Sequence, residues 1–238
     1  MFCCCNSPRA ASILLCASAL TIGGVLMART GNAQETARPA AEAAQATPAA
    51  KPAAPAAKPA DAAPAGKITA TIDDVHSMAL FRVQHMGAGA FWGRFNDVSG
   101  TFTFTPGSTD GMLFDVTIKA DSVDSGNNNL NTHLRSPDFF AAKDFPTLTF
   151  KSTGAKKTGE NTFDLMGDLT IRGVTKPVTA KLEYVGMANM GMGVRAGFEA
   201  TFTIKRSEFG VKYGVDKGAV GDDVRVIVGL EGTVGDGK

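Results

Sequence analysis

From Ile68 onwards, apolar and polar residues alternate in one segment after another. In residues 198–205 four apolar side chains alternate with four polar ones, and residues 114–119 show the same period of two. A period of two places all apolar side chains of a strand on one face and the polar ones on the other. A chain of such strands must wrap its apolar faces around one interior. The sequence therefore predicts an all-β domain, and it leaves open whether that interior is solid or hollow.

The alternation and the turn residues between its segments predict ten strands. Short turns without interleaved helices indicate an antiparallel sheet, closed into a barrel or doubled into a sandwich. The barrel is favoured because nearly every strand has one apolar and one polar face, and about eight strands enclose room for side chains or one slender ligand. The predicted strands are 68–72, 80–85, 91–95, 100–105, 113–120, 147–152, 162–171, 178–185, 194–204 and 224–233, with turns at 106–107, 158–161, 175–177 and 186–193.

One stretch, residues 127–140, lacks the period of two. Leu130 and Leu134 share a helical face, and Pro137 then begins a turn that leads to Phe139 and Phe140. We expect a short helix and a loop across one end of the barrel.

The segments before the barrel have a different composition. Residues 1–33 resemble an export signal, with Arg9 before an apolar stretch and a small-residue cleavage site at its end; an uncleaved membrane anchor is the alternative. Residues 34–66 are an Ala/Pro-rich sequence, typical of an extended linker. Residues 67–238 then form one domain, and the expected localisation is the periplasm.

All four cysteines, at positions 3, 4, 5 and 16, lie in the predicted export signal. The exported part would thus have no disulfide, thiol nucleophile or thiolate metal site. The net charge of the whole chain is +1, with basic and acidic residues interspersed, so nucleic acid is not an expected partner.

The chain offers little for catalysis or metal binding. Its three histidines, His76, His85 and His133, show no compact ligand spacing, and an uninterrupted strand would point the first two to opposite faces. Its serines lack the strand-turn-helix context of a nucleophile elbow. We expect no enzyme activity, no metal and no cofactor.

Several motifs of the chain stand out in order and spacing. They are 74–77 (DVHS), 81–87 (FRVQHMG), 93–95 (GRF), 133–140 (HLRSPDFF), 145–152 (FPTLTFKS), 167–178 (GDLTIRGVTKPV) and 207–210 (SEFG) followed by 220–224 (VGDDV). Over residues 67–234 they closely resemble the YceI-like family of bacterial periplasmic proteins. This resemblance implies a lipocalin-like antiparallel β-barrel with an apolar tunnel for a long amphiphile: a polyisoprenoid, such as an isoprenoid quinone or a prenyl pyrophosphate, or a fatty-acid derivative.

This chain departs from the family at residues 126–132, where Gly, Asn, Leu and Thr replace the usual charged residues. The departure puts in doubt any head-group contact assigned to that stretch.

Candidate ligand contacts follow from strand phase and from the predicted end loop, with plain core packing as the alternative for each. Arg94, Arg135, Arg172 and His85 are candidates for a polar or phosphate head, because guanidinium groups match phosphate geometry; solvated surface arginine is the alternative. The candidate tail contacts are Phe81, Val83, Phe102, Phe104, Phe114, Val116, Phe150, Phe202 and Ile204 on strands, and Phe139 and Phe140 in the loop.

The hypothesis is a periplasmic carrier that holds a polyisoprenoid or lipid without turnover. Two alternatives stay open: an enzyme, such as a hydrolase, acting on a lipid at the barrel mouth, and an envelope interaction module presented by the linker. Peripheral membrane contact and a homodimer also stay open.

Overall fold

The structure, a computed structural model, describes residues 66–235. The predicted export signal and all of the predicted linker except Gly66 lie outside the described residues. One α-helix, α1 (Asn128–Arg135), and two 3₁₀ turns, η1 (Ala120–Ser122) and η2 (Arg206–Phe209), accompany eleven strands. Between residues 66 and 235 the helices are too short or too polar to cross a membrane. The strands are β1 Ile68–Ile72, β2 Met78–His85, β3 Gly89–Phe95, β4 Val98–Thr105, β5 Ser108–Lys119, β6 Val123–Asp124, β7 Thr147–Lys157, β8 Thr162–Ile171, β9 Val174–Asn189, β10 Val194–Lys205 and β11 Val220–Val234.

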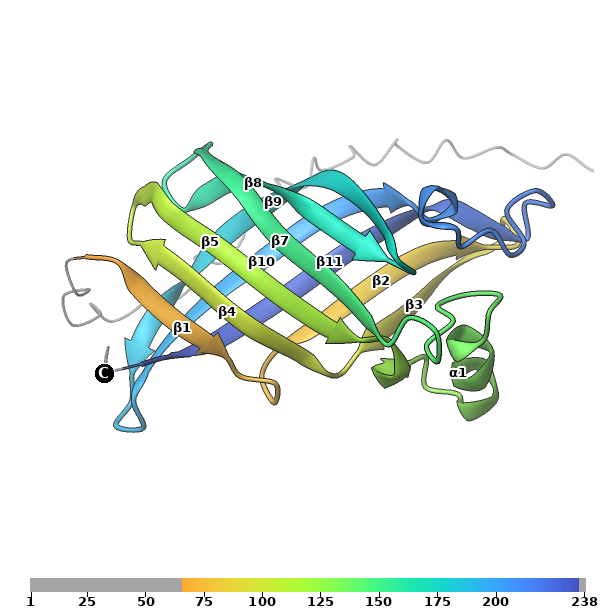
Figure 1. The fold of residues 1–238 in the computed structure, drawn as a ribbon, viewed down its shortest axis with the longest axis horizontal. Coiled ribbons are helices and arrows are strands. Elements are labelled where there is room, and N and C mark those ends of the chain that lie inside the picture. The colour runs from red at the N-terminus through yellow and green to blue at the C-terminus, as the bar shows by residue number, and fades with distance from the viewer. Residues whose placement is uncertain (1–65, 236–238) are drawn as a thin grey trace, which may run out of the picture. The chain divides into compact units, whose positions relative to one another are not determined.

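Eight strands close into an antiparallel barrel in the order β1-β4-β5-β7-β8-β9-β10-β11, because β11 pairs back to β1 (Figure 1). β11 is long enough to serve two partners: Thr233 lies opposite Thr71 of β1, and Val226 lies opposite Phe81 of β2. β2 and β3 therefore extend the wall on that side, and β6 pairs with β3. The predicted antiparallel barrel of about eight strands is confirmed.

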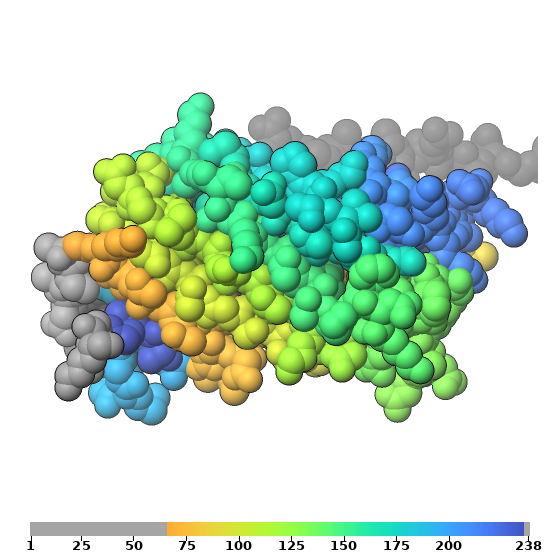
Figure 2. Space-filling model, viewed as in Figure 1, coloured from red at the N-terminus to blue at the C-terminus, as the bar shows by residue number. Residues whose placement is uncertain are grey.

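The wall has an apolar inner row on each strand and a polar outer row. Figure 2 shows one outer face, on which the side chains of β4, β5 and β7 form a continuous wall. Because the strands pair in register, the inner rows of β2, β10 and β11 meet in layers. From the α1 end inwards, these layers are Val83–Val224–Ile204, Phe81–Val226–Phe202, Ala79–Val228–Ala200 and Leu230–Phe198.

The helix α1 lies at one end of the barrel, as predicted (Figure 1). Asn127 is its N-cap: the side-chain Oδ1 accepts hydrogen bonds from the backbone N–H groups of Asn129 (3.0 Å) and Leu130 (3.1 Å). An asparagine at this position supplies an acceptor for helix N–H groups that have no partner within the helix. The Asn-rich stretch that departs from the family thus begins the helix.

Several strands are longer than predicted: β5 begins at Ser108 instead of residue 113, and β7 ends at Lys157 instead of residue 152. β9 runs from Val174 to Asn189 and includes the predicted turn at 175–177. Before Lys181 it pairs with β8 alone, so Pro177 lies on an edge stretch, where a residue without an N–H is tolerated. β11 begins at Val220, four residues early, with a register shift before Val224. The two-residue strand β6 was not predicted, since so short a segment shows no period.

Candidate functional site

An apolar cavity of ≈ 630 Å³ lies inside the barrel, at the end where α1 lies. The inner rows of β2, β10 and β11 line it down to Leu230, and Leu130 and Leu134 of α1 complete its wall. Pockets of this size and character are typical of small-molecule binding sites. The predicted tail contacts that line it are Phe81, Val83, Phe114, Val116, Phe139, Phe140, Phe150, Phe202 and Ile204, and the predicted head-group candidate His85 lines it as well.

Two glycines allow phenylalanine rings to lie directly against the backbone of the barrel wall. A Cβ at Gly93 would lie 2.4 Å from Cζ of Phe81, and a Cβ at Gly167 would lie 2.4 Å from Cζ of Phe150. Real Cβ atoms do not approach a ring so closely, so any larger residue at these positions would push the ring into the cavity. The glycines therefore help to keep the cavity open.

Phe102 and Phe104, two of the predicted tail contacts, do not line the cavity. They face inwards, as strand phase predicted, but they are 0% and 1% exposed and lie beyond the cavity floor. There they pack with Phe114, Phe198 and Tyr184, with Phe198 at the centre: its ring centroid is 5.3 Å from that of Phe102 and 5.1 Å from that of Phe104. We call these five residues the aromatic plug. The interior is therefore hollow near α1 and closely packed with aromatic side chains beyond the cavity floor.

The predicted arginine contacts also lie outside the cavity lining. Arg135 donates to the backbone carbonyls of Asp121 (2.7 Å) and Val123 (3.3 Å), which braces η1 and β6. Arg94 pairs with Asp124 at 3.3 Å on the outer face of β3. Both guanidinium groups are occupied by local partners, because the loops near α1 leave backbone carbonyls and carboxylates within reach.

Arg172 connects two loops at the cavity mouth. Its Nη1 donates to the carbonyls of Pro137 (2.9 Å) and Phe139 (2.8 Å) in the loop after α1, and to that of Gly210 (3.3 Å) after η2. The residue adopts a left-handed backbone conformation, with φ of 51°, in the tight β8–β9 turn. Its role in the structure is to hold the mouth together, and it does not line the cavity.

One arginine that we did not predict, Arg206, does line the cavity. It is 5% exposed, and its guanidinium donates to the carbonyls of Val211 (3.1 Å), Tyr213 (2.8 Å), Val220 (2.8 Å) and Gly221 (2.7 Å). Burial lowers its pKa, and the nearby Asp222 partly offsets this effect; an arginine stays charged nevertheless.

A signal for Arg206 was present in the sequence. The alternation Phe198, Ala200, Phe202, Ile204 continues inwards to Arg206 if the period of two is extended by one step. The predicted strand 194–204 stops short of Arg206, and a charged side chain is rarely expected on an inner face.

The mouth also has an aromatic cluster of His133, Phe139 and Tyr213. The three ring centroids lie 5.0–5.2 Å apart, which connects α1 and its following loop to the loop after η2. His133 Nε2 lies 2.9 Å from Asp138 Oδ2. His133 and Tyr213, like Arg206, place polar groups at the edge of an apolar cavity.

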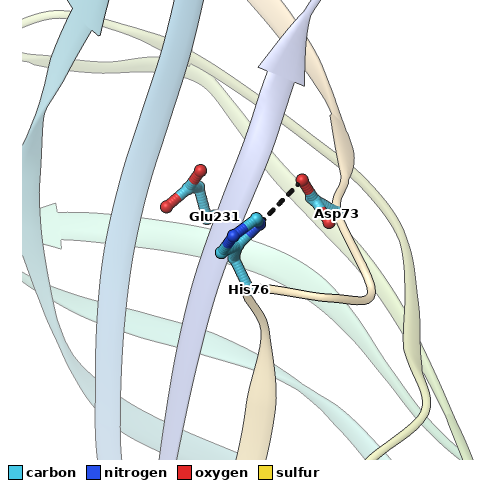
Figure 3. Close-up of side chains that lie close together, drawn as sticks. All are labelled: Asp73, His76 and Glu231. Carbon is cyan, nitrogen blue, oxygen red and sulfur yellow. Dashed lines mark hydrogen bonds and ion pairs between the residues drawn. The ribbon is translucent and has the colours of Figure 1, made fainter.

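A separate cluster of Asp73, His76 and Glu231 lies between β1, β2 and β11 (Figure 3). Asp73 Oδ2 lies 3.1 Å from His76 Nδ1. Arg195 pairs with Asp73 and, at 3.3 Å, with Glu231, so a cation of the chain already contacts both carboxylates. The cluster connects the β1–β2 turn to β10 and β11, and we propose no metal site there, because Arg195 already pairs with both carboxylates. His76 is also separated from His85 by the length of β2.

This cluster should make the thermal stability of the protein depend on pH in the acidic range. Hydrogen bonds from Arg195 and His76 hold the pKa of Asp73 well below its ordinary value. Stability from the ionised carboxylate is therefore present above the unfolded-state pKa of about 3.9 and is lost as pH falls through the folded-state pKa. Below about pH 4 we expect the melting temperature of Asp73→Asn to fall less than that of the unmodified chain. Melting curves from pH 7 to pH 2 would check this, with Glu160→Gln in the exposed β7–β8 turn as control; equal profiles for all three proteins would contradict it.

Comparisons with known proteins agree with this architecture. The model of the YceI-like domain matches residues 71–232. A UPF0312 protein of Pseudomonas paraeruginosa and the protein YceI of Escherichia coli O157:H7 are each 40% identical over 158 residues, covering 66% of this chain and 81% of the relative.

Three solved structures share the fold. Burkholderia cenocepacia BcnA is 28% identical, with a TM-score of 0.61, over 68% of this chain and 99% of its own. The Campylobacter jejuni YCEI protein is 30% identical, with a TM-score of 0.57, over 63% and 88%. A polyisoprenoid binding domain from Saccharophagus degradans has a TM-score of 0.56 over 71% and 99%, and at 17% identity its likeness is one of fold alone.

Proposed function

The chain belongs to the YceI-like family, and from this premise we propose that its barrel binds a polyisoprenoid, or a similar long-chain amphiphile, by the apolar tail. The single observation that carries the proposal is the cavity of ≈ 630 Å³, which is lined almost wholly by apolar side chains. The fold-level likeness to a polyisoprenoid binding domain supports the same ligand class.

The affinity of such a site would come from the tail. Each methylene moved from water into an apolar cavity contributes roughly 0.8 kcal/mol, so a few isoprene units would supply most of the binding free energy. Phe81, Phe150 and Phe202 provide large apolar surfaces for the tail along the cavity wall. The preformed cavity limits the conformational entropy that binding costs.

We place the polar head at the mouth, beside Arg206. Its guanidinium has five N–H groups, and hydrogen bonds within residues 66–235 account for four of them, all to backbone carbonyls. The guanidinium brings a positive charge to an apolar cavity, where an anionic or carbonyl oxygen would be a favourable partner. His85, His133 and Tyr213 are the other polar side chains at this end.

We propose binding without turnover. Within the described lining, the polar side chains are those of His85, His133, Thr149, Arg206 and Tyr213, and none of them is a serine, cysteine or lysine nucleophile. The His133–Asp138 pair could move a proton, but the described lining offers it no serine, cysteine or lysine to activate. The carrier would work in the periplasm, a location that rests on the export signal predicted at residues 1–33.

A direct test is to purify the chain from the envelope of its own host and to extract the bound lipid. We expect one long-chain isoprenoid or acyl compound per barrel, identified by native mass spectrometry and by mass spectrometry of the extract. Val226→Trp should lower the affinity for the lipid at least tenfold, and with it the recovered occupancy, because the indole extends into the cavity and excludes at least two methylenes of roughly 0.8 kcal/mol each.

The matched control is Arg225→Trp, which places the same indole on the exposed outer face of β11 one residue away. It should retain the lipid. Protein recovered empty from its host, or equal occupancy in the two variants, would contradict the proposal.

A further inference from the structure

We propose that the aromatic plug sets the length of the chain that the barrel accepts, with a limit of about five isoprene units. Phe114 is the residue through which the plug meets the cavity. This inference rests on the proposed function and deepens it, because it assigns a specificity-determining role to residues beyond the cavity.

The floor of the cavity is rigid by construction. Phe114 lines the cavity and also stacks on Phe102, at a centroid distance of 5.6 Å and an interplanar angle of 19°. It meets Phe198 at 5.2 Å in a T-shaped contact. These three side chains are at most 3% exposed. A tail that reaches Phe114 therefore meets closely packed rings, which move only at a large cost.

The aromatic plug is also packed against other groups on the side away from the cavity. A Cβ at Gly232 would lie 2.7 Å from the ring of Phe102, so the Phe102 ring already lies directly against the β11 backbone. Tyr184 packs on Phe198 at 5.2 Å and on Phe104 at 5.5 Å. The rings are thus packed on the side away from the cavity as well, which opposes their displacement by a longer tail.

The volume of the cavity converts into a chain length. An apolar cavity of about 150 Å³ accommodates benzene, which corresponds to about 25 Å³ per carbon. At that density ≈ 630 Å³ holds about 25 carbons, or about five isoprene units. With the head at the mouth and the floor closed, further units would remain in water and would add no affinity.

The experiment uses prenyl diphosphates of two to eight isoprene units, so that the head is constant and only the tail varies. Delipidated protein is titrated with each compound, and the affinities are compared. For the unmodified chain we expect affinity to rise steeply, by roughly fourfold for each added buried carbon, and to level off at about five units.

Two substitutions should move this plateau in opposite directions. Phe114→Ala removes about a benzene's volume from the floor and should shift the plateau up by about one unit. Ala200→Phe adds a ring in the layer above Phe198 and should shift it down by about one unit. Thr201→Phe, on the outer face of β10, is the matched control and should leave it unchanged. If Phe114→Ala does not fold, as judged by circular dichroism, the Ala200→Phe result alone decides.

The outcomes separate the two proposals. If the unmodified chain binds none of the prenyl diphosphates, and its host-purified form is empty, the proposed function fails. Two other outcomes would leave the proposed function standing but show that the aromatic plug does not limit tail length. In the first, the affinity of the unmodified chain keeps rising through eight units. In the second, the plateau stays at the same length in the variants that fold.

Discussion

Phe198→Ala should destabilise the barrel by about 3–5 kcal/mol, the range for removing a phenylalanine from a closely packed core. Phe198 is 2% exposed, and its ring contacts four other aromatic rings in the aromatic plug. The void left behind could not collapse, because those rings are held by one another and by the surrounding strands. Urea denaturation followed by circular dichroism would measure the loss, and a fall in melting temperature of about 10 °C or more should accompany it.

Phe202→Ala is the matched comparison. Phe202 lies on the same strand and the same face, but it lines the cavity and is only partly buried. Its removal enlarges an existing space, so we expect less than half of the destabilisation of Phe198→Ala. Equal losses for the two variants would mean that the interior is uniformly packed, and the distinction between cavity and plug would then be wrong.

Arg206→Met should both loosen the mouth and weaken binding of anionic lipids. Methionine keeps much of the apolar bulk but donates no hydrogen bond, so the four carbonyls that Arg206 now satisfies lose a partner. Unpaired polar groups at a mostly buried position cost about 1–3 kcal/mol each, and access to water at the mouth limits the total to roughly 2–4 kcal/mol. Hydrogen exchange should show lost protection in residues 206–221.

The binding part of this prediction needs two ligands of equal tail length, farnesyl diphosphate and farnesol. We expect Arg206→Met to lower affinity for the diphosphate about tenfold more than for the alcohol, since only the diphosphate loses a charge-assisted partner. Arg206→Lys keeps the charge, but one ammonium cannot reach all four carbonyls. It should therefore retain the preference for diphosphate and still lose protection in the loop. If Arg206→Met keeps the same preference for the diphosphate, Arg206 does not contact the head group.

The sequence predicted the cavity wall better than the mouth. Phe81, Val83, Phe150 and Ile204 were identified from strand phase, and all four line the cavity. Strand phase works for these residues because a period of two depends only on the local backbone. The roles of the arginines at the mouth were harder to predict, because their hydrogen-bond partners lie in loops that only the tertiary structure brings close. Arg135 and Arg172 were expected to meet a ligand head, but each is occupied by backbone carbonyls from segments distant in the sequence.

The sequence did not predict how far into the barrel the cavity extends before the interior becomes closely packed. Phe104 and Phe202 have the same residue type and the same phase, yet one is in the aromatic plug and the other lines the cavity. The difference lies in their neighbours across the barrel: Phe104 packs against Tyr184 and Phe198, whereas the layer below Phe202 holds the small side chains of Ala79 and Ala200.

Alternation along the chain thus determined that these strands have one apolar face and that they enclose a single interior, because that pattern arises within each strand. Whether a given ring fills the interior or borders an empty space was decided only when the sheet closed. Closure sets which residues from distant strands share a layer, and the summed volume of a layer, which no single strand contains, determines whether a tail can enter.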